Sequence, residues 1–245
     1  MFRFKSSELA ERREEVHDMI RNSVIVSVQA PDGHPMRDTH TLTHVARACV
    51  EGGSRAIRCG GYGGIKDVEA IVAAVDVPVF GLTKEGSEGV YITPTVESVR
   101  QLVEAGAAVI CADATDRPRP DGSSFSDLVA ECHGLNVLSM ADCSTPEEMQ
   151  RAHQAGADII STTLAGYTEF RSKTEGPDLE CLAEGRRLCG EDAFVIGEGR
   201  FASRDDVAAG KRAGANAIII GTAITDPAWI TRSFNSLRGL SQRSQ

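Results

Sequence analysis

Short apolar runs alternate with helical patterns along this chain of 245 residues. Three segments resemble one another: EAGAAVICAD at 104–113, QAGADIISTT at 154–163 and RAGANAIIIG at 212–221, with VEGGSRAIRC at 50–59 as a weaker copy. In each, a helical pattern ends at a glycine, which suits the left-handed position after a helix, and a β-branched run follows. The repeat predicts the helix-to-strand half of an α/β unit.

The apolar runs predict eight strands. They are Val24–Gln29, Arg55–Cys59, Pro78–Thr83, Ala107–Asp113, Asn136–Asp142, Asp158–Thr163, Ala193–Glu198 and Asn216–Gly221. Helical patterns such as Lys66–Val75, Pro146–Ala155 and Arg204–Ala213 separate them, and Ser144-Thr145-Pro146 and Ala202-Ser203 are expected helix starts. We expect one α/β domain over residues 1–245, a single (β/α)8 TIM barrel, with residues 1–21 as an N-terminal helical cap.

A doubly wound open sheet is the competing fold. It would usually place a glycine fingerprint after the first strand, where this chain has QAPDGHP. The glycine-rich segment CGGYGG at 59–64 does not fit GxGxxG, and we expect a flexible turn there after the second strand.

Composition narrows the functional classes. The net charge of −9 opposes general attraction to nucleic acid or an anionic membrane. No apolar run approaches a membrane span and the start lacks a signal-peptide core, so we expect a soluble cytoplasmic protein. Seven cysteines without a CxxC pair indicate reduced thiols.

His40 and His44 would share a helix face, but without a third ligand a solvated face is favoured over a metal site.

Polar residues stand at the carboxyl ends of all eight predicted strands. In chain order they are Gln29, Arg58, Lys84, Asp113, Asp142, Thr162-Thr163, Glu198 and Gly221-Thr222. Any one of them reads equally well as an ordinary solvated strand end. Together they predict a polar ring at the end of the barrel where catalytic groups gather.

Three loops carry further signals. GEGRFAS at 197–203 and GTAIT at 221–225 are either tight turns or a phosphate site, in which Gly199 and Gly221 admit the anion and Arg200 adds a charge. Their adjacency favours phosphate. The loop DATDRPRPDG at 113–122 is either a solvated turn or a stiff wall that positions Asp113 and an arginine near the ligand.

The sequence resembles the N-acetylmannosamine-6-phosphate 2-epimerase family over nearly its whole length. DATDRPRPDG, and AGYT followed by GEGR, are its most specific motifs. The other matching segments are VIVSVQA, AIRCGG, VFGLTK, VYITPT, MADCST and IIIGTAIT. Three features depart from the family pattern: the length of CGGYGG, the pair Glu85-Gly86, and Ala165 before GYT.

The resemblance implies a barrel without cofactor or metal that interconverts N-acetylmannosamine 6-phosphate and N-acetylglucosamine 6-phosphate in amino-sugar and sialic acid catabolism. By matching motifs, Lys84 and Glu198 are the expected catalytic groups. The expected sugar contacts are Gln29, Arg58, Asp113, Asp142 and Tyr167. The expected phosphate contacts are Gly199, Arg200, Gly221 and Thr222.

Epimerisation at carbon 2 requires ring opening, a base for the carbon-2 proton and a positive group for the enolate oxygen. Lys84, Glu198 and Arg58 are of suitable type. Lys84 would act as a base if burial and Arg58 lowered its pKa by about 3 units, with Glu198 opposing that shift. Whether one base or two act is open. A Schiff-base aldolase using Lys84 and a non-catalytic sugar-phosphate-binding barrel are the alternatives. A homodimer is expected by analogy with barrels of this size.

Overall fold

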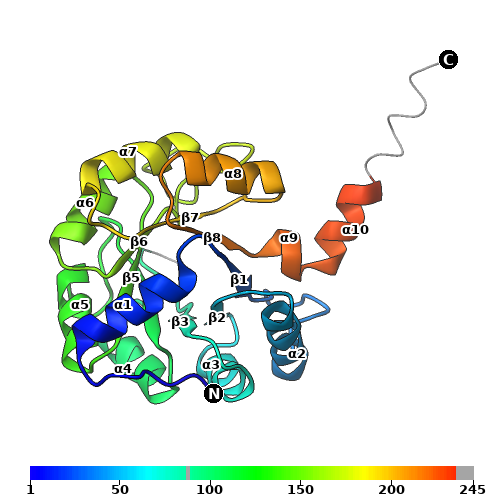
Figure 1. The fold of residues 1–245 in the computed structure, drawn as a ribbon, viewed down its shortest axis with the longest axis horizontal. Helices are drawn as coiled ribbons and strands as arrows, with labels where there is room; N and C mark the ends of the chain where they lie inside the picture. The colour runs from blue at the N-terminus through cyan, green and yellow to red at the C-terminus, as the bar shows by residue number, and fades with distance from the viewer. Residues whose placement is uncertain (87–88, 236–245) are drawn as a thin grey trace.

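The computed structural model describes residues 1–86 and 89–235, so residues 236–245 of the expected domain lie outside the described residues. Eight parallel strands close into a barrel in chain order, with the last strand paired to the first. The strands are β1 (Val24–Val28), β2 (Ile57–Gly61), β3 (Val79–Thr83), β4 (Val109–Asp113), β5 (Leu138–Asp142), β6 (Ile159–Ser161), β7 (Val195–Glu198) and β8 (Ala217–Ile220). The expected (β/α)8 fold is confirmed (Figure 1).

Helices surround the barrel. They are α1 (Leu9–Ile20), α2 (Thr39–Glu51), α3 (Ile65–Ala74), α4 (Val96–Glu104), α5 (Phe125–Gly134), α6 (Pro146–Gln154), α7 (Leu179–Cys189), α8 (Arg204–Arg212), α9 (Thr222–Thr225) and α10 (Pro227–Asn235). The expected starts of α6 and α8 are confirmed, because Thr145 and Ser203 each form a capping box with the acidic residue three positions on. All four repeat glycines have left-handed backbone: φ is 101° at Gly53 and Gly214, 87° at Gly106 and 90° at Gly156.

Side chains alternate between two cores along each strand. The interior set fills the barrel and the outward set packs under the helices. Leu82 and Met140 belong to the interior set, and two positions further on stand Lys84 and Asp142. The period of two therefore aims the polar strand ends at the barrel axis, above the apolar layers.

The second strand differs from the expectation. It spans Ile57–Gly61 instead of 55–59, so the first half of CGGYGG is strand and not a flexible turn. Gly60 and Gly61 pair with Leu82 and Thr83 of β3. A Cβ at Gly60 would lie 1.9 Å from the Leu82 carbonyl oxygen. Close strand pairing thus overrides the low strand propensity of glycine.

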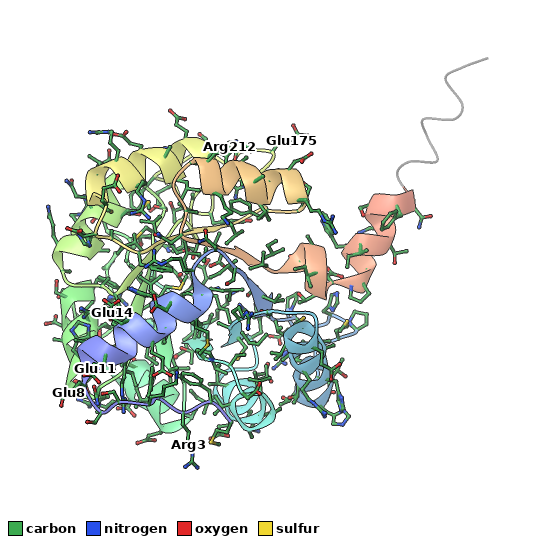
Figure 2. The ribbon with its side chains drawn as sticks, viewed as in Figure 1. Arg3, Glu8, Glu11, Glu14, Glu175 and Arg212 are labelled. Carbon is green, nitrogen blue, oxygen red and sulfur yellow. The ribbon has the colours of Figure 1, made fainter. Side chains whose placement is uncertain are left out.

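Helix α1 covers the amino-terminal end of the barrel (Figure 1). Val16 and Ile20 are buried against the interior core. Arg13 Nε donates to Asp158 Oδ1 at 2.5 Å, at the entrance to β6. Figure 2 shows Glu8, Glu11 and Glu14 along this helix, all three exposed. The helix therefore has an apolar face against the barrel and an exposed acidic face.

Beyond β8 the chain departs from the usual pattern of a helix packed on the barrel. Helix α10 extends away from the strands and buries none of its residues (Figure 1). Phe234 in α10 is 71% exposed. Within residues 1–86 and 89–235, no helix has both the length and the apolar character to cross a bilayer. All seven cysteines are free thiols, and six of them are buried.

Candidate functional site

Arg58 lies at the centre of a buried cluster of charges inside the carboxyl end of the barrel. Its Nη2 donates to Asp142 Oδ2 at 2.6 Å, and its Nη1 donates to Glu198 Oε1 at 3.2 Å. The Arg58 side chain is 3% exposed and the Asp142 side chain is fully buried. Three strands, β2, β5 and β7, therefore converge on one ion network.

Thr163 connects the two carboxyl groups on their other sides. Its Oγ1 lies 2.6 Å from Asp142 Oδ1, 2.9 Å from Glu198 Oε2 and 2.9 Å from Ser161 Oγ. Thr162 fixes the backbone of Glu198, since its Oγ1 accepts from Glu198 N at 3.0 Å and donates to Glu198 O at 2.9 Å. The end of β6 thus orients the end of β7.

Lys84 is held at the tip of β3. Its backbone N–H donates to Gly61 O at 3.1 Å, and its backbone forms an isolated antiparallel bridge with Ile92. Its Nζ lies 4.4 Å from the centre of the Tyr62 ring. Burial and the neighbouring Arg58 lower the pKa of Lys84 from 10.5 to about 8, against the opposing effect of Glu198 and Asp142. The direction and causes are those expected from the sequence.

Glu85, a departure from the family pattern, anchors the turn that carries Lys84. Its Oε1 accepts from Thr83 Oγ1 at 2.6 Å and from Ser98 Oγ at 2.9 Å. Its N–H donates to Tyr91 O at 2.9 Å. Glu85 therefore ties the end of β3 to the first turn of α4.

Burial and neighbouring charges shift the pKa values of the cluster's groups in different ways. Burial raises the pKa of Asp142, although Arg58 opposes the shift, and Glu198 adds to it. Burial alone would lower the pKa of Arg58, but Asp142 and Glu198 together raise it well above its usual value. Arg58 is therefore a permanent cation, whereas the Asp142 carboxyl group and Lys84 can exchange protons near neutral pH.

Two buried polar atoms beside the cluster have no partner among the described residues: Gln29 Oε1 and Arg58 Nε. Gln29 follows β1 directly and its Nε2 donates to Ser27 Oγ at 2.9 Å. Buried polar groups without partners cost free energy, and a bound ligand can satisfy them. The site therefore offers one acceptor, Gln29 Oε1, to a polar molecule, whereas the Arg58 side chain also contacts the buried Cys111 thiol.

Asp113 and the loop at residues 113–122 share a network of hydrogen bonds. Asp113 is fully buried, and its carboxylate accepts from Thr115 N at 2.9 Å and from Arg117 Nη2 at 2.5 Å. Arg119 is buried beneath the loop, where it donates to backbone oxygens of Thr93 and Asp113. The guanidinium of Arg117 bonds within the loop, and that of Arg119 bonds both to the loop and to the preceding segment at Thr93.

The expected phosphate loops stand after β7 and β8. Gly199 and Arg200 both have positive φ, 101° and 59°. The Arg200 side chain turns to the loop after β6, where it donates to Gly176 O at 2.8 Å and Ala165 O at 2.9 Å. Its guanidinium lies 5.1 Å from the centre of the Tyr167 ring. Ala165, another departure from the family pattern, thus contributes its carbonyl to this contact.

Gly221 and Thr222 lie at the junction of β8 and α9. Gly221 caps α9, and its carbonyl accepts from Ile224 N at 2.9 Å. An added Cβ at Gly221 would stand 3.5 Å from Ser27 Cβ. This junction therefore adjoins the end of β1.

Metal binding finds no support among residues 1–86 and 89–235, where no group of three or more His, Cys, Asp or Glu side chains could hold an ion. His40 and His44 contact each other at 3.2 Å between their Nε2 atoms on an exposed face of α2. The expected solvated face fits this placement.

Sequence reasoning assigned no role to three residues of the site. Thr163 was only one polar strand end among eight, Tyr62 lay in an expected flexible turn, and Glu85 was an unexplained departure. The polar identity of Thr163 was visible in the sequence. Its position between two carboxyl groups depends on strand pairing across the barrel.

Comparison with known proteins identifies the family. Residues 42–238 match the model of the NanE family, described as "Putative N-acetylmannosamine-6-phosphate epimerase". A Corynebacterium glutamicum protein named "Putative N-acetylmannosamine-6-phosphate 2-epimerase" is 65% identical over 230 residues, covering 94% of this chain and 99% of its own length. A Cutibacterium acnes protein of the same name is 42% identical, covering 86% and 91%.

A solved structure agrees. The N-acetylmannosamine-6-phosphate 2-epimerase from Clostridium perfringens superimposes with a TM-score of 0.85 at 34% identity, covering 90% of this chain and 95% of that one. The chain belongs to the NanE family of N-acetylmannosamine-6-phosphate epimerases.

Proposed function

We propose that this protein interconverts N-acetylmannosamine 6-phosphate and N-acetylglucosamine 6-phosphate by removing and returning the proton at carbon 2. The observation that carries the proposal is the placement of Lys84, with a pKa lowered to about 8, beside the Arg58–Asp142–Glu198 network. Membership of the NanE family supports the same substrate. The reaction belongs to amino-sugar and sialic acid catabolism.

The chemistry follows from the acidity of carbon 2. Its proton becomes acidic only when carbon 1 is an aldehyde, so the sugar ring opens first. Lys84 in its neutral form removes the proton, and Arg58 stabilises the enolate oxygen. Because carbon 2 loses and regains a proton and not a hydride, these steps need no hydride acceptor. Glu198 supplies an acid or base for ring opening or for the second face of carbon 2.

Substrate contacts complete the proposal. Gln29 and Asp142 bind sugar oxygens, and the free acceptor at Gln29 Oε1 supports this role. Asp113 and Tyr167 contribute at the edge of the site. Backbone N–H groups of Gly199, Arg200, Gly221 and Thr222 bind the phosphate. For Arg200 the proposed contact is through the backbone, since its guanidinium holds the loop after β6.

Proton NMR of the purified protein with N-acetylmannosamine 6-phosphate in deuterium oxide tests the function. We expect N-acetylglucosamine 6-phosphate as product, with deuterium from solvent at carbon 2. Substantial retention of the original proton would indicate a single base that serves both faces. Absence of any product would overturn the proposal and leave a sugar-phosphate-binding barrel.

A buried lysine of lowered pKa also suits Schiff-base chemistry, and so the aldolase alternative has its own test. Borohydride added with substrate would trap a Schiff base as a mass increase on the peptide that contains Lys84. For the epimerase we expect neither the mass increase nor substrate-dependent inactivation.

We further infer that the enzyme is a cytoplasmic homodimer. A groove of about 610 Å³ on the outside of the barrel, between α2 and α8, is lined by Val207, Ala223 and Ile224, and Ile224 is 41% exposed. Helix α10, with its exposed Phe234, extends beyond the barrel. These are two apolar surfaces of one chain, which a second copy would cover. We expect a dimer in sedimentation equilibrium that Phe234→Asp weakens, whereas a monomeric wild-type protein would overturn the inference.

A further inference from the structure

The hydrogen-bond geometry at Thr163 limits where protons can reside in the charge cluster. A threonine hydroxyl has one proton to donate and two lone pairs that accept. Thr163 Oγ1 has three oxygen neighbours within hydrogen-bond distance: Asp142 Oδ1, Ser161 Oγ and Glu198 Oε2. It has one proton to donate, so it cannot donate to both carboxyl groups.

In the contact with Ser161, Thr163 is the donor, so Ser161 supplies no proton to it. Because Thr163 has only one proton, at least one of the two carboxyl groups can pair with it only as a donor, and a carboxyl group donates only when it is protonated. If both carboxyl groups were ionised, a carboxylate oxygen would face a lone pair of Thr163 at 2.6 or 2.9 Å. The geometry therefore requires one proton on the Asp142–Glu198 pair.

Charge balance also indicates one proton on the Asp142–Glu198 pair. Arg58 is a single cation that contacts both carboxyl groups. The other titratable groups around the pair are Lys84 directly after β3, Tyr91 in the loop that follows, Cys111 and Asp113 in β4, and Cys143 directly after β5. When Lys84 is neutral and ready to act as a base, only Arg58 balances the two carboxyl groups. One proton on the pair then leaves the three groups without net charge.

We propose that Thr163 is a proton relay between Asp142 and Glu198. Asp142 gives its Oδ1 proton to Thr163 Oγ1 while Thr163 gives its own proton to Glu198 Oε2. One O–H bond breaks and one forms at each transfer, and Thr163 remains a hydroxyl. Asp142 becomes a carboxylate held by Arg58, and Glu198 becomes a carboxylic acid. The reverse transfer returns the proton from Glu198 through Thr163 to Asp142.

The relay rests on the proposed function and adds a residue to it. Glu198 changes protonation state as it serves the sugar, and the relay resets it from Asp142 without solvent. Thr163 is thus a positioning residue that acts through Glu198. Its hydroxyl is needed, whereas its methyl group is not.

The test compares Thr163→Val, which keeps the shape and removes the hydroxyl, with Thr163→Ser, which keeps the hydroxyl. For Thr163→Val we expect kcat to fall by about 10- to 100-fold with KM within about threefold. Small buffer acids should then raise kcat in proportion to their concentration, because they replace the relay. Thr163→Ser and the remote control Thr43→Val in α2 should keep kcat within about threefold of wild type.

Equal kcat in Thr163→Val and wild type, or a loss without any response to buffer, would overturn the relay. An inactive wild-type protein would instead reject the proposed function. Infrared difference spectroscopy of the wild-type protein keeps the test decisive if Thr163→Val fails to fold. A carboxylic-acid C=O band at neutral pH that Asp142→Asn removes or shifts is expected. Absence of such a band would show that the pair holds no proton and refute the relay.

Discussion

Arg58 Nη2 lies 2.6 Å from Asp142 Oδ2, and both side chains are almost completely buried. The same guanidinium reaches Glu198 with its other terminal nitrogen. A planar guanidinium can span two carboxyl groups, whereas an ammonium group is a point charge. The pair therefore fixes the cation of the site at one depth in the barrel, above the apolar interior.

Arg58→Lys should lower kcat/KM by at least about 100-fold, because one ammonium cannot satisfy both carboxyl groups and stabilise an enolate. Arg187→Lys, at an exposed surface ion pair, is the matched control and should remain fully active. Steady-state kinetics on both variants checks the prediction. Wild-type activity in Arg58→Lys would remove Arg58 from the mechanism.

Lys84→Ala and Lys84→Arg should both abolish carbon-2 exchange, because neither side chain offers an amine that is neutral near pH 7. Sugar-phosphate binding should persist, as measured by a thermal shift with N-acetylglucosamine 6-phosphate. Lys211→Ala on the exposed face of α8 is the control. Near-normal turnover in either Lys84 variant would contradict its role as the base.

The pH dependence of kcat/KM should follow the titration of Lys84. Burial and Arg58 lower its pKa to about 8, and only the neutral amine accepts a proton. Activity should therefore rise about tenfold per pH unit below pH 7 and stop rising near pH 8. A profile recorded from pH 6 to 9.5 measures this limb. A flat profile over that range would show that Lys84 does not limit the reaction.

Glu85→Ala should impair catalysis although Glu85 is not expected to contact the substrate. Glu85 holds the turn after β3 through Thr83 and Ser98, so its loss frees the backbone that aims Lys84. We expect kcat to fall about tenfold with KM nearly unchanged, since small displacements of a catalytic group are costly. Glu85→Gln keeps the acceptor oxygen and should retain most activity. If Glu85→Ala and Glu85→Gln lose equal activity, the charge and not the anchor matters.

Asp158 should govern acid stability from the opposite end of the barrel. Burial alone would raise the pKa of Asp158, but His133, Ser139 N and Arg13 lower it below 3.8. Its contribution to stability is therefore complete above the usual carboxyl pKa and is lost as pH falls through the lower folded value. Asp158→Asn should reduce the free energy of unfolding at pH 7 by about 3 kcal/mol in urea titrations. The exposed control Asp192→Asn should leave it unchanged.

The fold class and the residues of the polar ring were predictable from the amino-acid sequence. The repeated glycine before each β-branched run fixes where helices end and strands begin, and all four repeat glycines have the left-handed backbone this requires. The period of two then decides which residues face the axis. Lys84 and Asp142 were therefore identifiable as strand-end candidates, because local backbone preference and alternation are properties of the chain alone.

Which polar strand ends meet depends on the closed barrel. Arg58 and Asp142 belong to β2 and β5, Thr163 follows β6, and the distances among them depend on barrel closure and strand register. The extension of β2 through Gly61 has the same origin, since pairing with β3 supplies hydrogen bonds that glycine propensity cannot anticipate. The raised pKa of Asp142 was equally hidden, whereas the lowered pKa of Lys84 was expected from the sequence. The lowered pKa of Lys84 and the raised pKa of Asp142 arise from burial and neighbours that exist only once the barrel has closed.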